Sequence, residues 1–202
     1  LFKKNKITRL EGSARIDSAG AVTIVDGKDK GNFSTDKIMI ATGSHASSLP
    51  GITIDEKRIV SSTGALSLDR CPKKLLVIGA GYIGLELGTV WARLGAEVEV
   101  IEFLPRILPG MDDEIAKKFL AIAKKQGVSF RPSTAVKAAK TSKTGVSLTV
   151  EPAAGGAAET VTGDIVLMSV GRHLVTDGLG LEAAGISLTE RGRIAVDLRF
   201  ET

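Results

Sequence analysis

A turn containing three glycines, Gly79-Ala80-Gly81-Tyr82-Ile83-Gly84, constrains the fold of this chain more than any other feature of its sequence. The apolar run Lys74 to Ile78 precedes the turn and predicts a strand that is covered on both faces. Residues Tyr82 to Leu94 follow with helical spacing, and Val98 to Ile101 form the next predicted strand. A buried strand, a glycine-rich turn, a helix and a second strand make up the order of a dinucleotide-binding βαβ unit.

Each glycine has a mechanical role in such a turn. Gly79 turns the chain from strand to helix, Gly81 lets a pyrophosphate approach the backbone, and Gly84 lets the helix pack against the sheet. The pyrophosphate then lies at the helix N-terminus, where backbone N–H groups and the positive end of the helix dipole meet it. The alternative reading is a plain tight turn.

Glu102 closes the second strand, 18 residues after Gly84. Its carboxylate can accept hydrogen bonds from the adenosine ribose diol and would repel a 2′-phosphate, so the sequence predicts NAD rather than NADP. Arg106 is near enough in sequence to keep NADP open, and Glu102 could also be a solvated strand end. Glu86, near the helix start, either stabilises the helix dipole or lies near the nicotinamide.

The chain before this unit is rich in predicted strands, at residues 7–10, 14–16, 21–25 and 37–41. We expect the last of these to be buried and to stop at Thr42-Gly43-Ser44. A short helical turn at residues 64–68 follows, capped by Ser62 or Thr63.

After residue 70 strands and helices alternate. The first helix is predicted to turn inward its larger apolar residues, Ile83, Leu87, Val90, Trp91 and Leu94. Asp112 or Asp113 caps a second helix, whose inward residues are predicted to be Ile115, Phe119, Ile122 and Ala123. Further strands are expected at residues 128–130 and 164–170, with an antiparallel meander at 135–139, 145–150 and 159–162. This order predicts an α/β, Rossmann-type domain over roughly residues 70–175.

The composition argues against several classes of function. The net charge is +4, but the basic residues are dispersed and not interleaved with aromatics, so we expect no nucleic-acid partner. No apolar run approaches the length of a membrane span, so we expect no membrane partner. Cys71, the one cysteine, is read as structural, and no set of zinc ligands is present. His45 and His173 have no catalytic partner nearby and are read as surface loop residues.

Several segments resemble the flavoprotein disulfide reductase family, in particular its dihydrolipoamide dehydrogenase branch. The resemblance is carried by residues 79–86, followed by Leu87-Gly88, Trp91, Leu94-Gly95 and Glu102. Residues 35–44, 62–66, 108–112 and 169–172 also agree with the family. One departure is the run 171–176, Gly-Arg-His-Leu-Val-Thr, where the family commonly has Arg-Pro-Asn-Thr after Gly-Arg.

The resemblance implies a Rossmann-type NAD domain with an antiparallel β-meander, joined to part of a β-rich FAD domain. It assigns residues 1–69 to a second FAD-domain segment and linker, 70–178 to the NAD domain and 179–202 to a return into the FAD domain. The NAD contacts it implies are Gly79, Ala80, Gly81, Tyr82, Ile83, Gly84, Leu85, Glu86, Glu102, Val136 and Gly171. The FAD contacts it implies are Ala14, Thr42, Gly43 and Ser44. Strand packing at Val136, a turn at Gly171 and a strand cap at Thr42 are the alternative readings.

The family's chemistry needs groups that this sequence does not contain. These are two cysteines separated by four residues, which pass electrons from dihydrolipoamide to FAD, and a His-Glu pair from the partner subunit. The FAD domain's own glycine motif is also absent. We therefore expect a middle piece of a longer enzyme, inactive by itself and weak in binding NAD(H).

The partners that the resemblance implies are the rest of the chain, a second subunit of a homodimer and the lipoyl domains of 2-oxoacid dehydrogenase complexes. It implies the mitochondrial matrix or the bacterial cytoplasm as the location. Two other functions stay open. A related NADPH-dependent reductase, such as glutathione or mercuric reductase, would usually have arginines where Phe103-Leu104 stand. A non-catalytic nucleotide-sensing module is the third reading.

Overall fold

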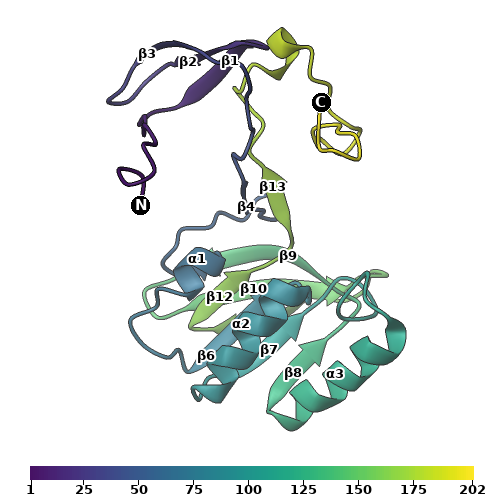
Figure 1. The fold of residues 1–202 in the computed structure, drawn as a ribbon. Coiled ribbons are helices and arrows are strands. Elements are labelled where there is room, and N and C mark those ends of the chain that lie inside the picture. The colour runs from purple at the N-terminus through teal and green to yellow at the C-terminus, as the bar shows by residue number, and fades with distance from the viewer. The chain divides into compact units, whose positions relative to one another are not determined.

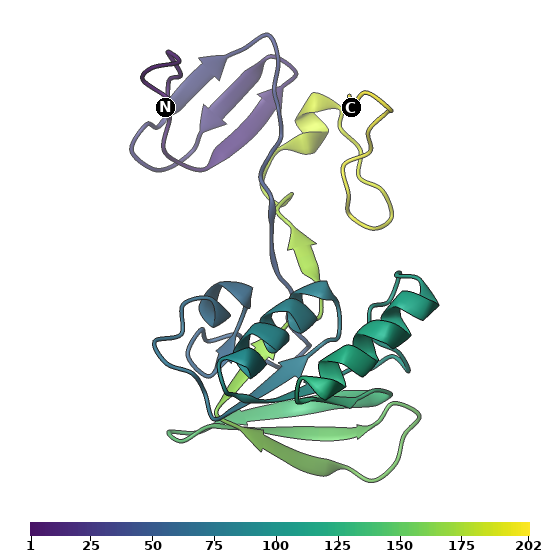
Figure 2. The same cartoon turned by 60° about the horizontal axis from the view of Figure 1, so that its bottom comes forward.

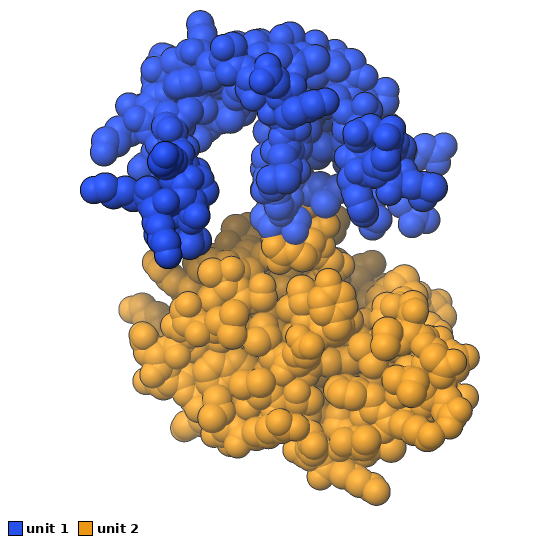
Figure 3. Space-filling view, viewed as in Figure 1, with its two compact units in different colours: residues 1–45, 174–202 blue, residues 46–173 orange.

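The computed structural model describes residues 1–202 and divides them into two compact units (Figures 1 and 3). Unit 1 comprises residues 1–45 and 174–202, coloured blue in Figure 3, and unit 2 comprises residues 46–173, coloured orange. Unit 2 is continuous in sequence, whereas unit 1 is built from the two segments that flank it. The glycine turn lies in unit 2.

Unit 2 is organised around a five-stranded parallel sheet with the strand order β5-β12-β6-β7-β8. The strands are β5 (Ile59–Val60), β6 (Lys74–Ile78), β7 (Glu97–Ile101), β8 (Val128–Arg131) and β12 (Ile165–Met168). The strands predicted at residues 74–78, 98–101, 128–130 and 164–170 are therefore confirmed, within a few residues at their ends. A parallel sheet whose strands alternate with helices along the chain confirms the α/β, Rossmann-type fold.

Helices cover one face of this sheet (Figure 2). They are α1 (Ser62–Ala65), α2 (Tyr82–Arg93) and α3 (Asp113–Lys125). The core under them joins alternate strand residues such as Val77, Val98 and Leu167 to Leu85 and Trp91 of α2. Alternation places these residues on the helix side of the sheet because successive side chains of a strand point to opposite faces.

An antiparallel meander covers the other face, as predicted, with the order β11-β10-β9. Its strands are β9 (Thr134–Thr141), β10 (Val146–Pro152) and β11 (Glu159–Gly163). Leu148 and Val150 of β10 pack with Leu76, Ile78 and Val166 of the parallel sheet. Unit 2 thus has three layers, which are helices, parallel sheet and meander.

The predicted inward faces of both long helices are partly wrong. In α2, Val90 and Leu94 are exposed and Ile83 is half-buried, whereas Gly84, Leu85, Gly88 and Trp91 are buried. In α3, Ile115 and Ile122 are exposed, and Ala116 and Ala123 are buried. The predictions for Trp91 and Ala123 are confirmed, and Leu87 and Phe119 pack against the same core. Small residues let a helix backbone approach the sheet closely, which is why glycine and alanine share the contact face with the larger side chains.

The caps of the shorter elements also differ in detail from the prediction. Helix α1 spans residues 62–65 rather than 64–68, and Ser61, not Ser62 or Thr63, is its N-cap. Its side chain accepts a hydrogen bond from Thr63 N. Asp112, one of the two candidates, caps α3 by accepting from the N–H groups of Glu114 and Ile115.

Unit 1 contains a three-stranded antiparallel sheet in the order β1-β2-β3. The strands are β1 (Ala14–Ser18), β2 (Ala21–Ile24) and β3 (Gly31–Ser34), and the 3₁₀ helix η1 (Leu181–Ala184) packs beside β1. Ile16 N donates to Leu179 O at 2.7 Å, which ties the two segments of this unit together. Two short strands, β4 (Ser44–Ala46) and β13 (Arg172–Leu174), pair where the chain passes between the units.

The strands predicted at residues 7–10 and 37–41 are wrong, because neither stretch is a strand in the structure. Met39 is 89% exposed, and Ile38 and Ile40 are only half-buried, where they pack against the cluster of Ile16, Leu179 and Leu181. A buried strand needs hydrogen-bonded neighbours and a covering layer, and these residues have no paired strand beside them. His45 and His173 are exposed as expected, but they lie in β4 and β13 rather than in loops. None of the helices has the length and apolar character required to cross a membrane.

Candidate dinucleotide site

The glycine turn begins directly after β6, and Gly79 is required there by the fold. Its φ is +100°, a conformation that L side chains rarely adopt, and an added Cβ would lie 2.6 Å from Ser169 O. Its N–H donates to Ile101 O of β7 at 2.9 Å. The turn therefore starts between β7 and the end of β12, with no room for a side chain.

Gly84, in the first turn of α2, is also required by the fold. A Cβ at this position would lie 2.3 Å from Gly79 O, 2.5 Å from Ser169 Oγ and 3.0 Å from Val77 Cγ1. Gly79 O is a backbone atom of the turn, and Ser169 Oγ is held against Ile78 O and Gly79 O, so neither atom can easily move aside. The helix can start this close to the sheet only because residue 84 lacks a side chain.

Gly81 differs from the other two glycines. It is the N-cap of α2 with a φ of −76°, which any residue can adopt, and an added Cβ would meet no atom within 4 Å. The fold itself therefore does not require glycine at this position. The open space beside it is on the turn where the sequence predicts the pyrophosphate.

The start of α2 also differs from the starts of the other helices. No side chain caps it, whereas Ser61 caps α1 and Asp112 caps α3. The first turn of α2 contains no acidic residue that would offset the positive end of its dipole. A helix of 12 residues with this N-terminus favours an anion beside the turn.

Glu102 connects the end of β7 to the glycine turn. Its Oε2 accepts a hydrogen bond from Ala80 N at 2.6 Å, and its Oε1 accepts one from Leu104 N at 2.8 Å. Its backbone is held as well, because Glu102 N donates to Arg131 O and Thr134 N donates to Glu102 O, both at 2.9 Å. Glu102 is 8% exposed, so it is a buried acid beside the turn rather than a solvated strand end.

Arg106 is committed to the loop before α3. Its guanidinium forms an ion pair with Asp113 and donates to Met111 O at 2.6 Å. The two residues directly after Glu102 are the uncharged Phe103 and Leu104.

The remaining residues predicted for NAD surround the turn or lie in the meander. Tyr82 and Glu86 are exposed, Ile83 is half-buried, and Leu85 is buried in the helix-side core. Val136 lies in β9, where it is half-buried and packs against the meander core. Gly171 has a φ of +139°, and its carbonyl accepts from Ser47 N at 3.0 Å.

The residues predicted for FAD lie in or at the edge of unit 1. The Thr42 hydroxyl donates to Val175 O at 2.6 Å, and Val175 N donates to Gly43 O at 3.1 Å. Ser44 begins β4, directly after these two residues, so the structure brings this stretch together with the returning chain. Ala14 is exposed at the start of β1.

Sequence reasoning missed Ser169, which lies against the glycine turn at the end of β12. Its hydroxyl is 2.8 Å from Ile78 O and 3.0 Å from Gly79 O. The only signal was its place in the stretch 169–172 that resembles the family. Nothing in the pattern of residues showed that its side chain would reach the turn.

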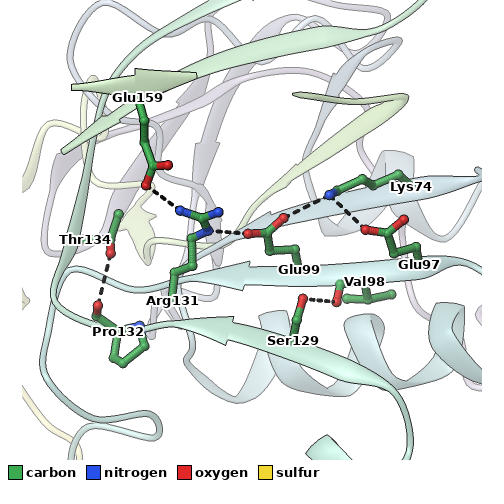
Figure 4. Close-up of polar contacts among 9 residues, drawn as sticks. All are labelled: Lys74, Glu97, Val98, Glu99, Ser129, Arg131, Pro132, Thr134 and Glu159. Atoms are coloured by element: carbon green, nitrogen blue, oxygen red, sulfur yellow. Dashed lines mark hydrogen bonds and ion pairs between the residues drawn. The ribbon is translucent and has the colours of Figure 1, made fainter. Parts of the chain in front are cut away.

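Sequence reasoning also missed a row of charged residues that joins the parallel sheet to the meander (Figure 4). Lys74 of β6 pairs with Glu97 at 2.8 Å and with Glu99 at 3.0 Å, and Arg131 of β8 pairs with Glu99 and with Glu159 of β11. The alternation Glu97-Val98-Glu99 was a usable signal, because it puts both carboxylates on one face of a strand.

Glu99 is the buried centre of this row, with a side chain 9% exposed. Burial raises its pKa, but the hydrogen bonds and charges of Arg131 and Lys74 outweigh burial, so the pKa of Glu99 lies below its ordinary value. In the same row, the hydrogen bond to Glu97 is the main cause that raises the pKa of Lys74. The row therefore stays charged at neutral pH and ties β6, β7 and β8 to β11.

The chain resembles known proteins along its whole length. The mitochondrial dihydrolipoyl dehydrogenase of Pisum sativum is 50% identical over 207 residues, which cover 100% of this chain and 40% of the relative. Dihydrolipoyl dehydrogenase 3 of Pseudomonas putida is 50% identical over 197 residues, which cover 96% of this chain and 42% of the relative. The chain thus spans about 40% of the length of these curated relatives.

A solved structure agrees with the fold. The HOCl-induced flavoprotein disulfide reductase RclA of Escherichia coli superposes with a TM-score of 0.82 at 29% identity, over 95% of this chain and 42% of that protein. The family described as pyridine nucleotide-disulphide oxidoreductase matches residues 2–202. The predicted resemblance is therefore confirmed, and this chain belongs to the pyridine nucleotide-disulphide oxidoreductase family.

Proposed function

We propose that unit 2 binds NAD(H), with the pyrophosphate on the turn Gly79–Gly84 and the adenosine ribose at Glu102. The observation that carries this proposal is the contrast among the three glycines. Gly79 and Gly84 are explained by contacts within the fold, whereas Gly81 has an ordinary φ and open space where a Cβ would lie. A ligand whose phosphates approach the backbone there accounts for the third glycine.

The surroundings of Glu102 support NAD over NADP. The carboxylate is buried beside the turn, where it would repel a 2′-phosphate. A phosphate there would need a cation, but Phe103 and Leu104 carry none and Arg106 is engaged with Asp113. The remaining NAD contacts in this proposal are Ala80, Tyr82, Ile83, Leu85, Glu86, Val136 and Gly171.

We further propose that the whole protein is a dihydrolipoamide dehydrogenase. The two thiols of dihydrolipoamide would be oxidised to the disulfide of lipoamide, and the two electrons would pass through a redox disulfide and FAD to reduce NAD⁺ to NADH. The relatives with about 50% identity support this reaction. The cofactors supply the redox chemistry, while the residues of unit 2 bind and orient the dinucleotide.

In this proposal, unit 1 is a segment of the FAD domain. Thr42, Gly43 and Ser44, with Ala14 as a further candidate, would contact FAD. The proposed domains are 1–69, 70–178 and 179–202; of these, residues 46–69 lie in unit 2, where β5 joins the parallel sheet, and residues 174–178 lie in unit 1. The partners would be the remainder of the same polypeptide, a second subunit of a homodimer and the lipoyl domains of 2-oxoacid dehydrogenase complexes. Dihydrolipoamide:NAD⁺ turnover by the 202-residue chain alone would contradict this division of roles, since the chain has one cysteine.

The mitochondrial relative supports a location in the mitochondrial matrix, and the Pseudomonas relative supports the alternative of a bacterial cytoplasm. Subcellular fractionation of the source cells, probed with an antibody to this chain, distinguishes the two.

NADH and NADPH titrations of the chain test the cofactor proposal, with the variant Gly81→Ala compared with Gly88→Ala. A methyl group at residue 81 would occupy the space left for the pyrophosphate, and overpacking of this kind costs about 1–3 kcal/mol, or about 5- to 150-fold in Kd. Gly88 lies in the same helix, where a Cβ would be an ordinary 3.5 Å from Val98 Cγ1, so this control should bind NADH normally. Tighter binding of NADPH than of NADH, or equal effects of the two variants, would contradict the proposal.

A further inference from the structure

We propose that Ser169 is a positioning residue for the dinucleotide turn, and that it acts with Glu102 by fixing one peptide group, the one between Gly79 and Ala80. Ser169 would not touch the reacting atoms in this role. The inference rests on the proposed function in one respect, namely that the ligand of the turn is NAD(H).

The hydroxyl of Ser169 holds the carbonyl end of this peptide group. Its Oγ lies 2.8 Å from Ile78 O and 3.0 Å from Gly79 O, and a hydroxyl has one hydrogen to donate. Ile78 O already accepts Ser169 N at 2.9 Å, as part of the ladder between β12 and β6. Ile78 O is thus paired even without the hydroxyl, and the proposal assigns the hydroxyl hydrogen to Gly79 O, the acceptor that belongs to the glycine turn.

Glu102 holds the N–H end of the same peptide group. Ala80 N donates to its Oε2 at 2.6 Å, and Ala80 is fully buried. A peptide unit is planar, so bonds from β12 at one end and from β7 at the other fix its rotation. Ala80 O is held in turn by Leu108 N at 2.9 Å.

The turn needs this support because of its glycines. The close packing against Ser169 and Val77 permits only glycine at residues 79 and 84, and glycine has the most freely rotating backbone. Orientation of the N–H groups after Gly79 follows from the plane of the Gly79–Ala80 peptide. Two side-chain bonds to this peptide therefore restore the stiffness that the glycines remove.

The arrangement can persist when a ribose is bound. A carboxylate has about four lone-pair sites, and Glu102 uses one on each oxygen for Ala80 N and Leu104 N. The remaining sites can accept the ribose hydroxyls, so the ligand need not displace the turn.

The test compares Ser169→Ala with Ser129→Ala in the 202-residue chain. Ser129 is a matched control, because its hydroxyl also donates to a carbonyl of the neighbouring strand, Val98 O at 2.9 Å, but does not contact the glycine turn (Figure 4). Three quantities are measured, namely the melting temperature, the amide exchange rate of Ala80 by NMR and the Kd for NADH.

We expect both variants to lower the melting temperature by similar amounts. Ser169→Ala alone should raise the exchange rate of Ala80 and the Kd for NADH, each by about three- to tenfold, the range that one hydrogen bond supplies. Unchanged Ala80 exchange in Ser169→Ala, or an equal loss of NADH affinity in Ser129→Ala, would overturn the inference.

The two proposals fail in different ways. If the unsubstituted chain shows no saturable binding of NADH, the cofactor proposal is contradicted. The exchange rate of Ala80 still decides whether Ser169 fixes the peptide, since that measurement needs no ligand.

Discussion

Units 1 and 2 differ in how completely their strands are covered. In unit 2, the central strand β6 has Leu75, Leu76 and Val77 at 0% exposure, because α2 covers one face of the sheet and the meander covers the other. In unit 1, the buried apolar residues are Ile16, Ile24, Leu179 and Leu181. The strands of both units form hydrogen-bonded ladders, with one register shift between Ile16 and Ser18 of β1, so the main difference between the units lies in packing.

Unit 1 also leaves large apolar side chains exposed. They are Leu1, Phe2, Ile7, Leu10, Met39, Leu174, Leu188, Val196, Leu198 and Phe200. Most of the stabilisation of a fold comes from burial of such side chains. The sheet of unit 2 is therefore covered on both faces, whereas the sheet of unit 1 packs only against the small cluster that joins Ile16 to Leu179 and Leu181.

The largest effect should come from a core truncation in unit 2. Leu167 is 0% exposed, and Leu167→Ala should reduce the free energy of unfolding of unit 2 by about 2–5 kcal/mol. Met39→Ala in unit 1, at a side chain that is 89% exposed, should change stability by less than about 0.5 kcal/mol.

Trp91 makes this comparison measurable, because the chain has one tryptophan and it lies in unit 2. Urea unfolding followed by Trp91 fluorescence reports unit 2. A loss on Met39→Ala as large as that on Leu167→Ala would break the distinction between the units.

An intermediate effect should come from glycine substitutions that separate contact from backbone strain. Gly84→Ala in unit 2 places a methyl group 2.3 Å from Gly79 O and should cost about 1–3 kcal/mol through overpacking. Gly43→Ala in unit 1 meets no atom within 4 Å, so only its φ of +75° opposes it, at a cost of about 1 kcal/mol.

Amide hydrogen exchange of each unit checks this pair of substitutions. Gly84→Ala should speed exchange in α2 and β6, and Gly43→Ala should act only near residues 42–44. Faster exchange throughout unit 2 caused by Gly43→Ala would show that the units do not respond separately.

The smallest loss of stability should come from removing the charge of Glu99, either by substitution or by lowering the pH. Its pKa is lowered in the folded state, so the stability it contributes is present above the ordinary carboxyl pKa of 4.5 and is lost as pH falls through the folded pKa. Glu99→Gln should therefore cost about 1 kcal/mol at neutral pH, and the difference from the unsubstituted chain should shrink as the pH falls below 4.5.

Urea unfolding at several pH values, followed by Trp91, measures that difference. Unit 1 provides the contrast, because the pKa of Asp17 is also lowered, by hydrogen bonds from Thr23 and Arg15, but at a half-buried site in the other unit. Asp17→Asn should leave the Trp91 transition unchanged at every pH. A pH-independent cost of Glu99→Gln would mean that the charge of Glu99 does not matter to stability.

The sequence predicted unit 2 better than unit 1 for a physical reason. The strand at residues 74–78 could be predicted because its apolar run is continuous. The helices and the meander that cover its two faces belong to the same unit and follow it in the sequence. The stretch 37–41 is also an apolar run after a lysine, but no strand pairs with it, so the pattern alone is insufficient. Ile115 and Ile122 were misplaced because Ala116 and Ala123 pack closer to the sheet than large side chains could.

The candidate site shows a similar limit. The three glycines and Glu102 could be predicted because their spacing along the chain carries their roles. The bond from Ala80 N to Glu102 and the contact of Ser169 with Gly79 could not, because they join residues 22 and 90 positions apart. Such pairs become neighbours only when the parallel strands align, and no local pattern reports that alignment.

The bond from Ser47 N to Gly171 O, at 3.0 Å, has a consequence for the ancestry and engineering of this protein. It places the entry and exit of unit 2 side by side, so residues 46–173 form a cassette inserted into a host module. Domains whose ends meet in this way tolerate transplantation and circular permutation. If residues 46–173 bind NAD(H) as proposed, this cassette could therefore be exchanged for one with another coenzyme preference without changing the path of the flanking segments.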